Sequence, residues 1–527
     1  MLKLRIQPAL LSREAGGWAW NNSRLQCGPS WVAPLDHPSL DAIALTDRDT
    51  GQSLVHVRER DAHRAGDARR AVVELASTAF RLLRAELLAW PLNFIAIDLA
   101  PDGTVSVTAG ERGTAPLYLT AADGVLHGSW TTAELVKRMP RVEFHVAETA
   151  RLLSLWFRYS HHTCFTGLYR LTERTTARYD GYGPVRFEQP APALHSKART
   201  LADDADVLTA YANMLDAVLD RHLYDPDTTS AHVSGGFDSA VIGTHLSLRH
   251  PGRIIASAML LPGPMGRQQR TRRAEMLRIG RFRTDITTPA LPPLHPDGRR
   301  ALSGYVYPYE EPYHESTAAL IYQLAGAGIR TVVTGIGGDE MVALTPQEAP
   351  HPPVGPGHAM TEWLGPAARE ALMDVDGDTC PPAVVNEMTL LAMASAAPLL
   401  LEAGIWPLHP FADPGMIRFG EWLPRPWRSR KCLHRRRLTA LGLSELVVEP
   451  PLPENFTDVM NTAIRTTLPA QVRRLLDQGS PLFDAKLVDA DTLTQALTRI
   501  ESGDIRATDD RLADVVAADL AHRAAHN

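Results

Sequence analysis

Residues 231–240 read AHVSGGFDSA, and this stretch predicts a strand, a glycine-rich turn and the start of a helix. The short apolar run 231–233 leads into the turn, and the apolar segment AVIGTHLSL (240–248) follows it. The free N–H groups and the dipole of a helix N-terminus attract anions. The stretch therefore predicts an anion-binding loop at the carboxyl end of a strand.

The side chains of this loop narrow the choice of anion. Gly235 and Gly236 let the backbone approach a ligand closely, and Ser234 and Ser239 add hydroxyl donors. Asp238 would repel a bare phosphate, but it can hold a divalent cation that bridges phosphate oxygens. The loop lacks the GxxxxGK[ST] pattern of a Walker loop. The residues alone also allow a plain glycine-rich turn in which Asp and Ser cap the helix.

A second stretch, TVVTGIGGDE (331–340), is again a strand that ends in glycines and acids. In open parallel sheets, ligands bind at the carboxyl ends of the strands. We therefore expect the two loops to face one crevice, where Asp238 and Asp339 share Mg²⁺ over a polyphosphate. Taken alone, the second stretch also fits an ordinary turn with an acidic helix cap.

The predicted secondary structure changes near residue 200. Before it, turn signals at 101–103 and 123–124 predict two hairpins, and 168–190 predicts two more short strands. A Pro- and Ala-rich stretch at 188–200 has linker character. Beyond it, strand-like and helix-like segments alternate, which predicts an α/β fold: a parallel sheet with helices on both faces. The segments that carry this pattern are 201–223 (helix), 253–261 (strand), 316–327 (helix), 329–340 (strand), 383–403 (helix) and 484–526 (helices).

Bulk composition excludes several classes of protein. The chain has 527 residues, so we expect two or more domains. The net charge of −6 argues against a general nucleic-acid binder, although a basic cluster, RPWRSRKCLHRRR, lies at 425–437. The four cysteines are far apart, with no CxxC pair, which favours a reducing cytoplasm. No signal peptide and no apolar run of about 18 residues is present, so we expect no membrane span.

The two loops together resemble a known family. SGGxDS is similar to the pyrophosphate loop of the ATP pyrophosphatases. SGGxDS followed by a strand and GxGGDE resembles the synthetase domain of the asparagine synthetase family, which includes β-lactam synthetases and lasso peptide macrocyclases. The resemblance covers about 205–440. Other family-like segments are Glu311-Pro312, PLHPFADPGMIRFGEWLP (407–424) and KCLHR (431–435).

The first half resembles the glutaminase domain of the same family. AGERGTAPLYL (109–119) and HGSWTTAEL (127–135) look like its hairpin, strand and helix. That glutaminase uses an N-terminal cysteine as nucleophile. Here Leu2 follows Met1, and the nearest cysteine is Cys27. The resemblance thus implies a degenerate Ntn-amidotransferase-like α+β domain at 1–195, and a PP-loop (adenine nucleotide alpha hydrolase-like) synthetase domain with a parallel sheet at 200–527.

The resemblance also implies roles for single residues. Lys431 would stabilise negative charge in the transition state, although it also fits a member of a solvated basic run. Glu311 and Glu340 would assist catalysis. Alternatively, Glu311 is an exposed acid of an acidic loop, and Glu340 is an acid at the start of a helix. Two departures stand out: Gln268-Gln269 replaces the family's acidic pair, and 447–456 carries no base. ATP or pyrophosphate would contact Ser234, Gly235, Gly236, Asp238, Ser239, Gly335, Gly337 and Gly338, and Mg²⁺ would bind Asp238 and Asp339.

The reaction implied is adenylation of a carboxylate followed by attack of an amine, with ATP and Mg²⁺ required. Ile336 stands where β-lactam synthetases have a Tyr and asparagine synthetases a Glu. This favours the lasso peptide cyclase branch, whose substrate is the core of a ribosomal precursor peptide and whose partners are a leader-recognition protein and a leader peptidase. The alternatives are a cyclase of a small β-amino acid, an ammonia-using amidating enzyme and an inactive ATP-binding scaffold.

Overall fold

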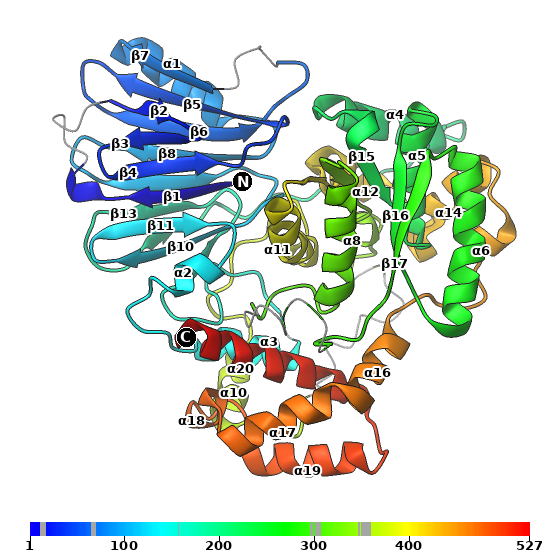
Figure 1. Ribbon diagram of the computed structural model, residues 1–527. Coiled ribbons are helices and arrows are strands. Elements are labelled where there is room, and N and C mark those ends of the chain that lie inside the picture. Colours follow the sequence, from blue (N-terminus) through cyan, green and yellow to red (C-terminus); the bar gives the residue numbers. More distant parts are fainter. Residues whose placement is uncertain are drawn as a thin grey trace.

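The protein combines strand-rich and α/β parts with a group of C-terminal helices, as Figure 1 shows. All residues singled out above for the site lie in the described part of the chain. The computed structural model describes residues 1–10, 17–64, 70–155, 157–295, 298, 300, 307–345, 348 and 360–526.

The first part of the chain forms two seven-stranded sheets. Their ladders are antiparallel, except that β5 and β7 pair in parallel. One sheet has the order β12 (Tyr169–Leu171), β10 (Leu117–Ala122), β11 (Val125–Ser129), β1 (Leu2–Ile6), β4 (Ser30–Pro34), β3 (Arg24–Cys27), β2 (Ala19–Asn21). The other has the order β14 (Arg186–Glu188), β13 (Thr176–Tyr179), β9 (Val105–Ala109), β8 (Phe94–Leu99), β6 (Ser53–Glu59), β5 (Leu40–Asp47), β7 (Arg70–Leu75).

Both predicted hairpins are present, as β8–β9 and β10–β11. The prediction of two strands over 168–190 was wrong, because this segment forms β12, β13 and β14. The chain leaves the first sheet after β12 and enters the second at β13. Arg174, between them, has a positive φ of 59°, so a sharp turn divides what the sequence pattern presents as one strand.

The α/β part is built on a parallel sheet, as predicted. Its first strand in the chain, β15, lies between the second and the fourth, so the strand order reverses at β15. Ligand crevices form outside the carboxyl ends of strands at such a reversal. The order across the sheet is β17 (Thr284–Pro289), β16 (Ile255–Leu260), β15 (Thr229–His232), β18 (Thr331–Val333), β19 (Trp406–Leu408).

Helices cover both faces of this sheet. Val333 packs with Val241 of α5 (Phe237–Arg249) and Met276 of α6 (Gly263–Gly280) in one buried cluster. The neighbouring Val332 packs in another cluster, with residues of α8 (His314–Gly326) and α11 (Glu387–Glu402). Successive side chains of a strand point to opposite faces, so the continuous apolar run of β18 serves both helix layers.

Among the remaining helices, α1 and α2 pack on the seven-stranded sheets, and the C-terminal helices gather at the lower end of the molecule in Figure 1. The C-terminal ones pack with α3 of the first part in one apolar cluster. Their bounds are α1 (Ser77–Leu88), α2 (Ala133–Val136), α3 (Val146–Ser154), α4 (Val207–Arg221), α9 (Gly338–Met341), α10 (Pro366–Ala371), α12 (Pro414–Trp422), α13 (Arg425–Arg428), α14 (Cys432–Ala440), α15 (Glu445–Val448), α16 (Thr457–Thr466), α17 (Leu468–Gln478), α18 (Pro481–Asp484), α19 (Ala490–Glu501) and α20 (Leu512–His526).

The two halves of the chain are joined by buried contacts. One apolar cluster runs from both seven-stranded sheets into the α/β part. Arg112 forms an ion pair with Asp413 (Nη2 to Oδ2, 2.5 Å), and both side chains are buried. The linker-like segment is held in place, since Ser196 N–H donates to Glu421 Oε2 (2.8 Å). The division near residue 195 stays a prediction, because the apolar core continues across it.

No helix in the part of the chain that the structure describes is long and apolar enough to span a bilayer.

Arg112→Met tests the buried ion pair between the halves. The change leaves the Asp413 carboxylate buried without its cation, so we expect a loss of about 3–5 kcal/mol in the free energy of unfolding. Arg178→Met is the matched control, because the Arg178–Glu188 pair is 50% and 57% exposed and should cost less than about 1 kcal/mol. Urea denaturation measures both, and equal small losses would contradict the assignment.

Candidate functional site

The SGGFDS loop joins β15 to α5, as the sequence predicts. Gly235 has a φ of 106°, which an L side chain rarely adopts. Ser239 Oγ accepts from Ser234 N–H (3.1 Å) and donates to the Gly236 carbonyl (3.0 Å). The hydroxyl of Ser239 therefore closes the loop on itself, and the first turn of α5 presents N–H groups that lack intrahelical acceptors.

The second loop lies directly against the first. A Cβ added at Gly335 would lie 2.7 Å from the Ser239 nitrogen, and one at Gly338 would lie 2.6 Å from Asp238 Cβ. Gly337 has a φ of 92°. Only glycine allows this approach, and the predicted meeting of the two loops is therefore found in the structure.

Lys431 joins the two acidic residues of these loops. Its Nζ donates to Asp238 Oδ2 at 2.8 Å and pairs with Asp339 Oδ1 at 2.5 Å. Lys431 has a φ of 55° and lies at the start of α14, so the basic stretch 425–437 is not a uniform solvated run. One ammonium group thus stands between two carboxylates from different strand ends.

Burial shifts the pKa values of the titratable groups in this cluster. It raises the pKa of Asp238 to about 6, against the opposing charge of Lys431. Burial acts to lower the pKa of Lys431, but the two carboxylates raise it above its usual range. At pH 7 the ion pair is therefore charged. His434 is fully buried, with its Nε2 3.5 Å from Asp238 Oδ1, and burial lowers its pKa to about 4.

The Gln268-Gln269 pair has a structural role. Gln269 Nε2 donates to the Ser234 carbonyl (2.6 Å), and its Oε1 accepts from Leu261 N–H (2.9 Å). It therefore fixes the SGGFDS loop to the end of β16. Gln268 Nε2 donates to Glu454 Oε1 (3.1 Å), so the segment 447–456 is held against this loop.

Glu454 is a functional candidate that sequence reasoning missed. Its carboxylate lies against Gly235, where a Cβ would collide with Oε2. Arg272, which is buried, pairs with Glu454 Oε1 at 2.8 Å. The segment 447–456, which contains no basic residue, thus brings a carboxylate to the predicted pyrophosphate loop. The basic partner of that carboxylate, Arg272, comes from α6. No sequence signal marks Glu454, because its position depends on long-range contacts.

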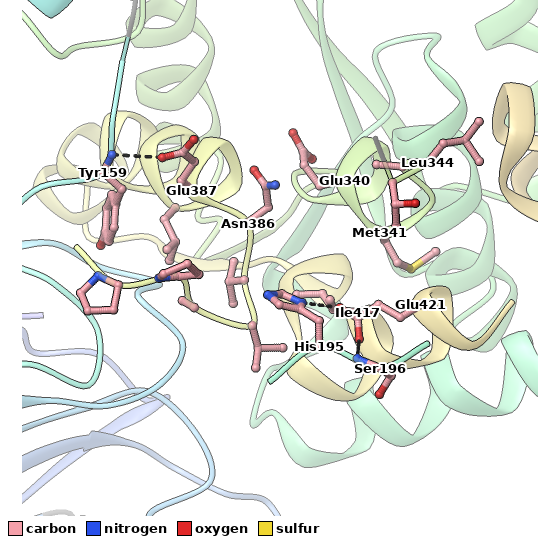
Figure 2. Close-up of a pocket in the computed structure, with 18 of the residues that line it drawn as sticks. Tyr159, His195, Ser196, Glu340, Met341, Leu344, Asn386, Glu387, Ile417 and Glu421 are labelled. Atoms are coloured by element: carbon pink, nitrogen blue, oxygen red, sulfur yellow. Dashed lines mark hydrogen bonds and ion pairs between the residues drawn. The ribbon is translucent and has the colours of Figure 1, made fainter. Parts of the chain in front are cut away.

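Glu340 lines a cavity of about 730 Å³, shown in Figure 2. Burial raises the pKa of Glu340. Other parts of the wall come from the start of α11, with Asn386 and Glu387, and from the linker-like segment, with His195. Ile336 packs at its edge in an apolar cluster with Tyr159 and Leu390.

Glu311 lies elsewhere. It lines a second cavity of about 600 Å³, between α11, α16 and α20. Burial raises its pKa, with the charge of Arg300 acting against this. The structure thus gathers most of the predicted site residues and places Glu340 at their edge and Glu311 in a separate cavity. The gathered residues are Ser234, Gly235, Gly236, Asp238, Ser239, Gly335, Gly337, Gly338, Asp339 and Lys431.

Asp238 and Asp339 suit a magnesium ion that is also bound by phosphates. The two carboxylates already hold one cation, the Lys431 ammonium. No group of three or more metal-binding side chains is found among the described residues. Mg²⁺ at polyphosphates needs only one or two carboxylates, with phosphate oxygens and water completing the octahedron. The residues present therefore fit this ion.

The cysteines are poor candidates for a nucleophile. Cys27 and Cys164 are buried, and burial raises the pKa of both thiols and of Cys380. A thiol of raised pKa holds little of the reactive thiolate at neutral pH. Cys432 opens α14 next to Lys431.

Comparison with known proteins gives little further information. No protein-family model matches the chain, and no curated protein matches it in sequence. Among solved structures, it is similar to glutamine phosphoribosylpyrophosphate (PRPP) amidotransferase from B. subtilis, complexed with ADP and GMP. The identity is 9%, the match covers 75% of this chain and 92% of that chain, and the TM-score is 0.20. At that TM-score the similarity carries no argument about fold or activity, and family membership stays a prediction.

Gly338→Ala tests the contact between the loops. The new Cβ would overlap Asp238, so we expect a loss of about 1–3 kcal/mol in the free energy of unfolding. Gly326→Ala is the control, because nothing lies within 4 Å of a Cβ there, and it should gain up to roughly 1 kcal/mol. Thermal unfolding of both variants measures the difference, and a neutral Gly338→Ala would show that the loops are loosely packed.

Proposed function

We propose that the protein is an ATP-dependent lasso peptide cyclase. It would adenylate an Asp or Glu side chain of a leader-cleaved core peptide and join it to the N-terminal amine of the same peptide. The observation that carries the proposal is the meeting of the SGGFDS and GIGGDE loops around Lys431. The two glycine-rich loops carry acids that face each other and share the Lys431 ammonium group. This arrangement suits a nucleoside triphosphate better than it suits a structural turn.

In this proposal the first loop receives the pyrophosphate. The Ser234 hydroxyl and the N–H groups of the first turn of α5 are hydrogen-bond donors for its oxygens, while Ser239 holds the loop closed. Asp238 and Asp339 would hold Mg²⁺, which neutralises phosphate charge when bound. The close packing of Gly335 on Ser239 keeps the second loop flat against the first, so that a nucleotide can lie across both.

Lys431 changes partner during the reaction. Without a nucleotide its ammonium pairs with Asp238 and Asp339. With Asp238 and Asp339 holding Mg²⁺, Lys431 would be able to turn to the α-phosphate, where negative charge develops. A partly exposed lysine with 25% of its side chain accessible can make this change without unfolding the loop.

Two bond exchanges then complete the reaction. A peptide carboxylate oxygen attacks the α-phosphorus, and the bond to pyrophosphate breaks. The N-terminal amine attacks the activated carbonyl carbon, AMP leaves, and the amine loses a proton. An α-amino group has a reference pKa of about 7.7–8.0, so a useful fraction is already neutral. This suits Ile336, which packs in an apolar cluster and supplies no base with its own side chain.

One observation favours a second candidate, an ATP-binding scaffold without turnover. Glu454 places a buried carboxylate against Gly235, where an anion would bind. A scaffold tolerates such a weakened phosphate site, whereas an enzyme needs Glu454 to move or to be neutralised. Turnover measurements separate the two candidates.

The first test follows AMP and pyrophosphate from ATP and Mg²⁺. Three substrate pools are offered: aspartate with ammonium, small β-amino acids, and linear peptides with an N-terminal Gly and an acid several residues downstream. We expect AMP only with peptides, and the peptide product should lose one water by mass. Asp238→Asn and Asp339→Asn should each lower AMP formation by about 100-fold or more. Asp203→Asn, on an exposed loop, is the control.

Each other outcome selects another function. AMP with a small amino acid alone would replace the peptide substrate. AMP with aspartate and ammonium would indicate an amidating enzyme. ATP binding without AMP, even with a leader-recognition protein and a leader peptidase added, would indicate the scaffold.

Glu454→Gln tests the acid at the loop. Removing the negative charge beside Gly235 should strengthen ATP binding and lower KM for ATP by roughly tenfold, since a nearby unit charge is worth about 1.4 kcal/mol or more. Glu449→Gln, half exposed on the same segment, is the matched control. Steady-state kinetics over a range of ATP concentrations measures both variants, and a higher KM in Glu454→Gln would show that Glu454 assists the nucleotide.

A further inference from the structure

The second cavity is built from segments far apart in the chain. Its wall takes Arg170 from β12, Tyr309 from the segment before α8, Met388 from α11, Met460 from α16 and Asp514 from α20. Its volume of about 600 Å³ lies within the usual range for small-ligand sites. Apart from Glu311, none of the residues predicted for the nucleotide site lines it.

Arg170 is the unusual residue of this cavity. It is only 3% exposed, yet no carboxylate in the described chain lies within ion-pair distance of it. Its Nε has no hydrogen-bond partner among the described residues. The guanidinium lies over the rings of Tyr159 and Tyr309, with 5.6 and 5.4 Å to the ring centroids. Burying an arginine without a carboxylate costs free energy that two aromatic rings offset only in part.

The neighbouring acids Glu148 and Glu173 form no ion pair with Arg170 in the described part of the chain. Glu148 and Glu173 are near enough for Arg170 to act on their pKa values, in opposition to the burial that raises both. Glu148, however, already pairs with Arg151.

The other arginines of the cavity do have partners. Arg506 pairs with Glu362 at 2.8 Å. Arg511 pairs with Asp510 at 2.5 Å and with Asp514 at 3.0 Å. Arg170 therefore stands apart from the arginines with which it shares the cavity wall.

Two tyrosine hydroxyls beside Arg170 also lack partners. Tyr307 and Tyr309 pack edge to face, with 5.3 Å between ring centroids, and both hydroxyls are buried without a hydrogen bond among the described residues. A hydroxyl and a guanidinium N–H are both donors. Buried donors without acceptors are rare, and their clustering indicates that an acceptor binds there.

We propose that this cavity binds the carboxylate of a peptide chain end, with Arg170 as its cationic partner and the Tyr309 hydroxyl as a second donor. An arginine fork matches a carboxylate in geometry and charge. The apolar side chains of Leu391, Met460 and Ile464 would cover the residue that carries it. The carboxylate site follows from the cavity itself, and only the assignment of its ligand as the cyclase substrate rests on the proposed function.

A matched pair of probes tests this site without ATP or turnover. N-acetyl-phenylalanine carries a chain-end carboxylate, and N-acetyl-phenylalaninamide differs only in that group. Ligand-observed NMR titration of the full-length protein should show the acid binding at least tenfold more tightly than the amide. Arg170→Met should remove this preference, and Tyr309→Phe should weaken it while keeping the ring. Arg506→Gln, an already paired arginine of the same wall, should keep it.

Further readouts separate a binding role from a structural one. Because Arg170 lacks a carboxylate partner, Arg170→Met should leave Tm unchanged or raise it. Equal binding of acid and amide, no binding of the acid, or a preference that survives Arg170→Met would each overturn the proposal. A lower Tm with unchanged binding would make Arg170 a structural support. As a further probe, 3-phenylpropanoate has the carboxylate without the peptide group. Binding of the N-acetyl acid alone would identify a peptide end, and binding of both acids would identify carboxylate recognition in general.

The result is independent of the AMP assay. Carboxylate binding without AMP formation would leave this site standing and remove the cyclase. AMP formation without a preference for the acid over the amide would support the cyclase and overturn the proposed carboxylate site.

Discussion

The absence of side chains at Gly335 and Gly338 is the constraint on which the candidate site depends. It lets the second loop lie against Asp238 and Ser239, at the point where the order of the parallel strands reverses. Two carboxylates from different strand ends then come close enough to share one ammonium group. A methyl group at either glycine would overlap Ser239 or Asp238, so the loops would have to move apart.

The local parts of this arrangement could be predicted from the sequence, because glycine, proline and hairpin signals act over a few residues. The strand–turn–helix at 231–240 and the hairpins at 94–109 and 117–129 are examples. The contacts of Glu454 and Gln269 could not be predicted, because both residues reach the loop from distant segments. Glu311 is a different case: similarity to a motif made it a catalytic candidate, whereas long-range packing puts its side chain in another cavity.

Helix α11 connects the two cavities. Glu387 and Leu390 line the cavity beside Glu340, whereas Met388 and Leu391 line the one that contains Arg170. Residues three or four apart share a helix face, and adjacent residues do not, so one helix presents a different wall to each side. The cavity beside Glu340 and the cavity that contains Arg170 thus lie against different faces of a single helix.

The continuous apolar core across the two halves has an evolutionary consequence. Side chains of both seven-stranded sheets pack in the same cluster as Val207, Tyr211 and Leu215 of α4, and α3 packs among the C-terminal helices. A shorter descendant without the first half would expose these surfaces to water and aggregate. Selection can therefore alter the surface chemistry of the first half, but it cannot discard that half.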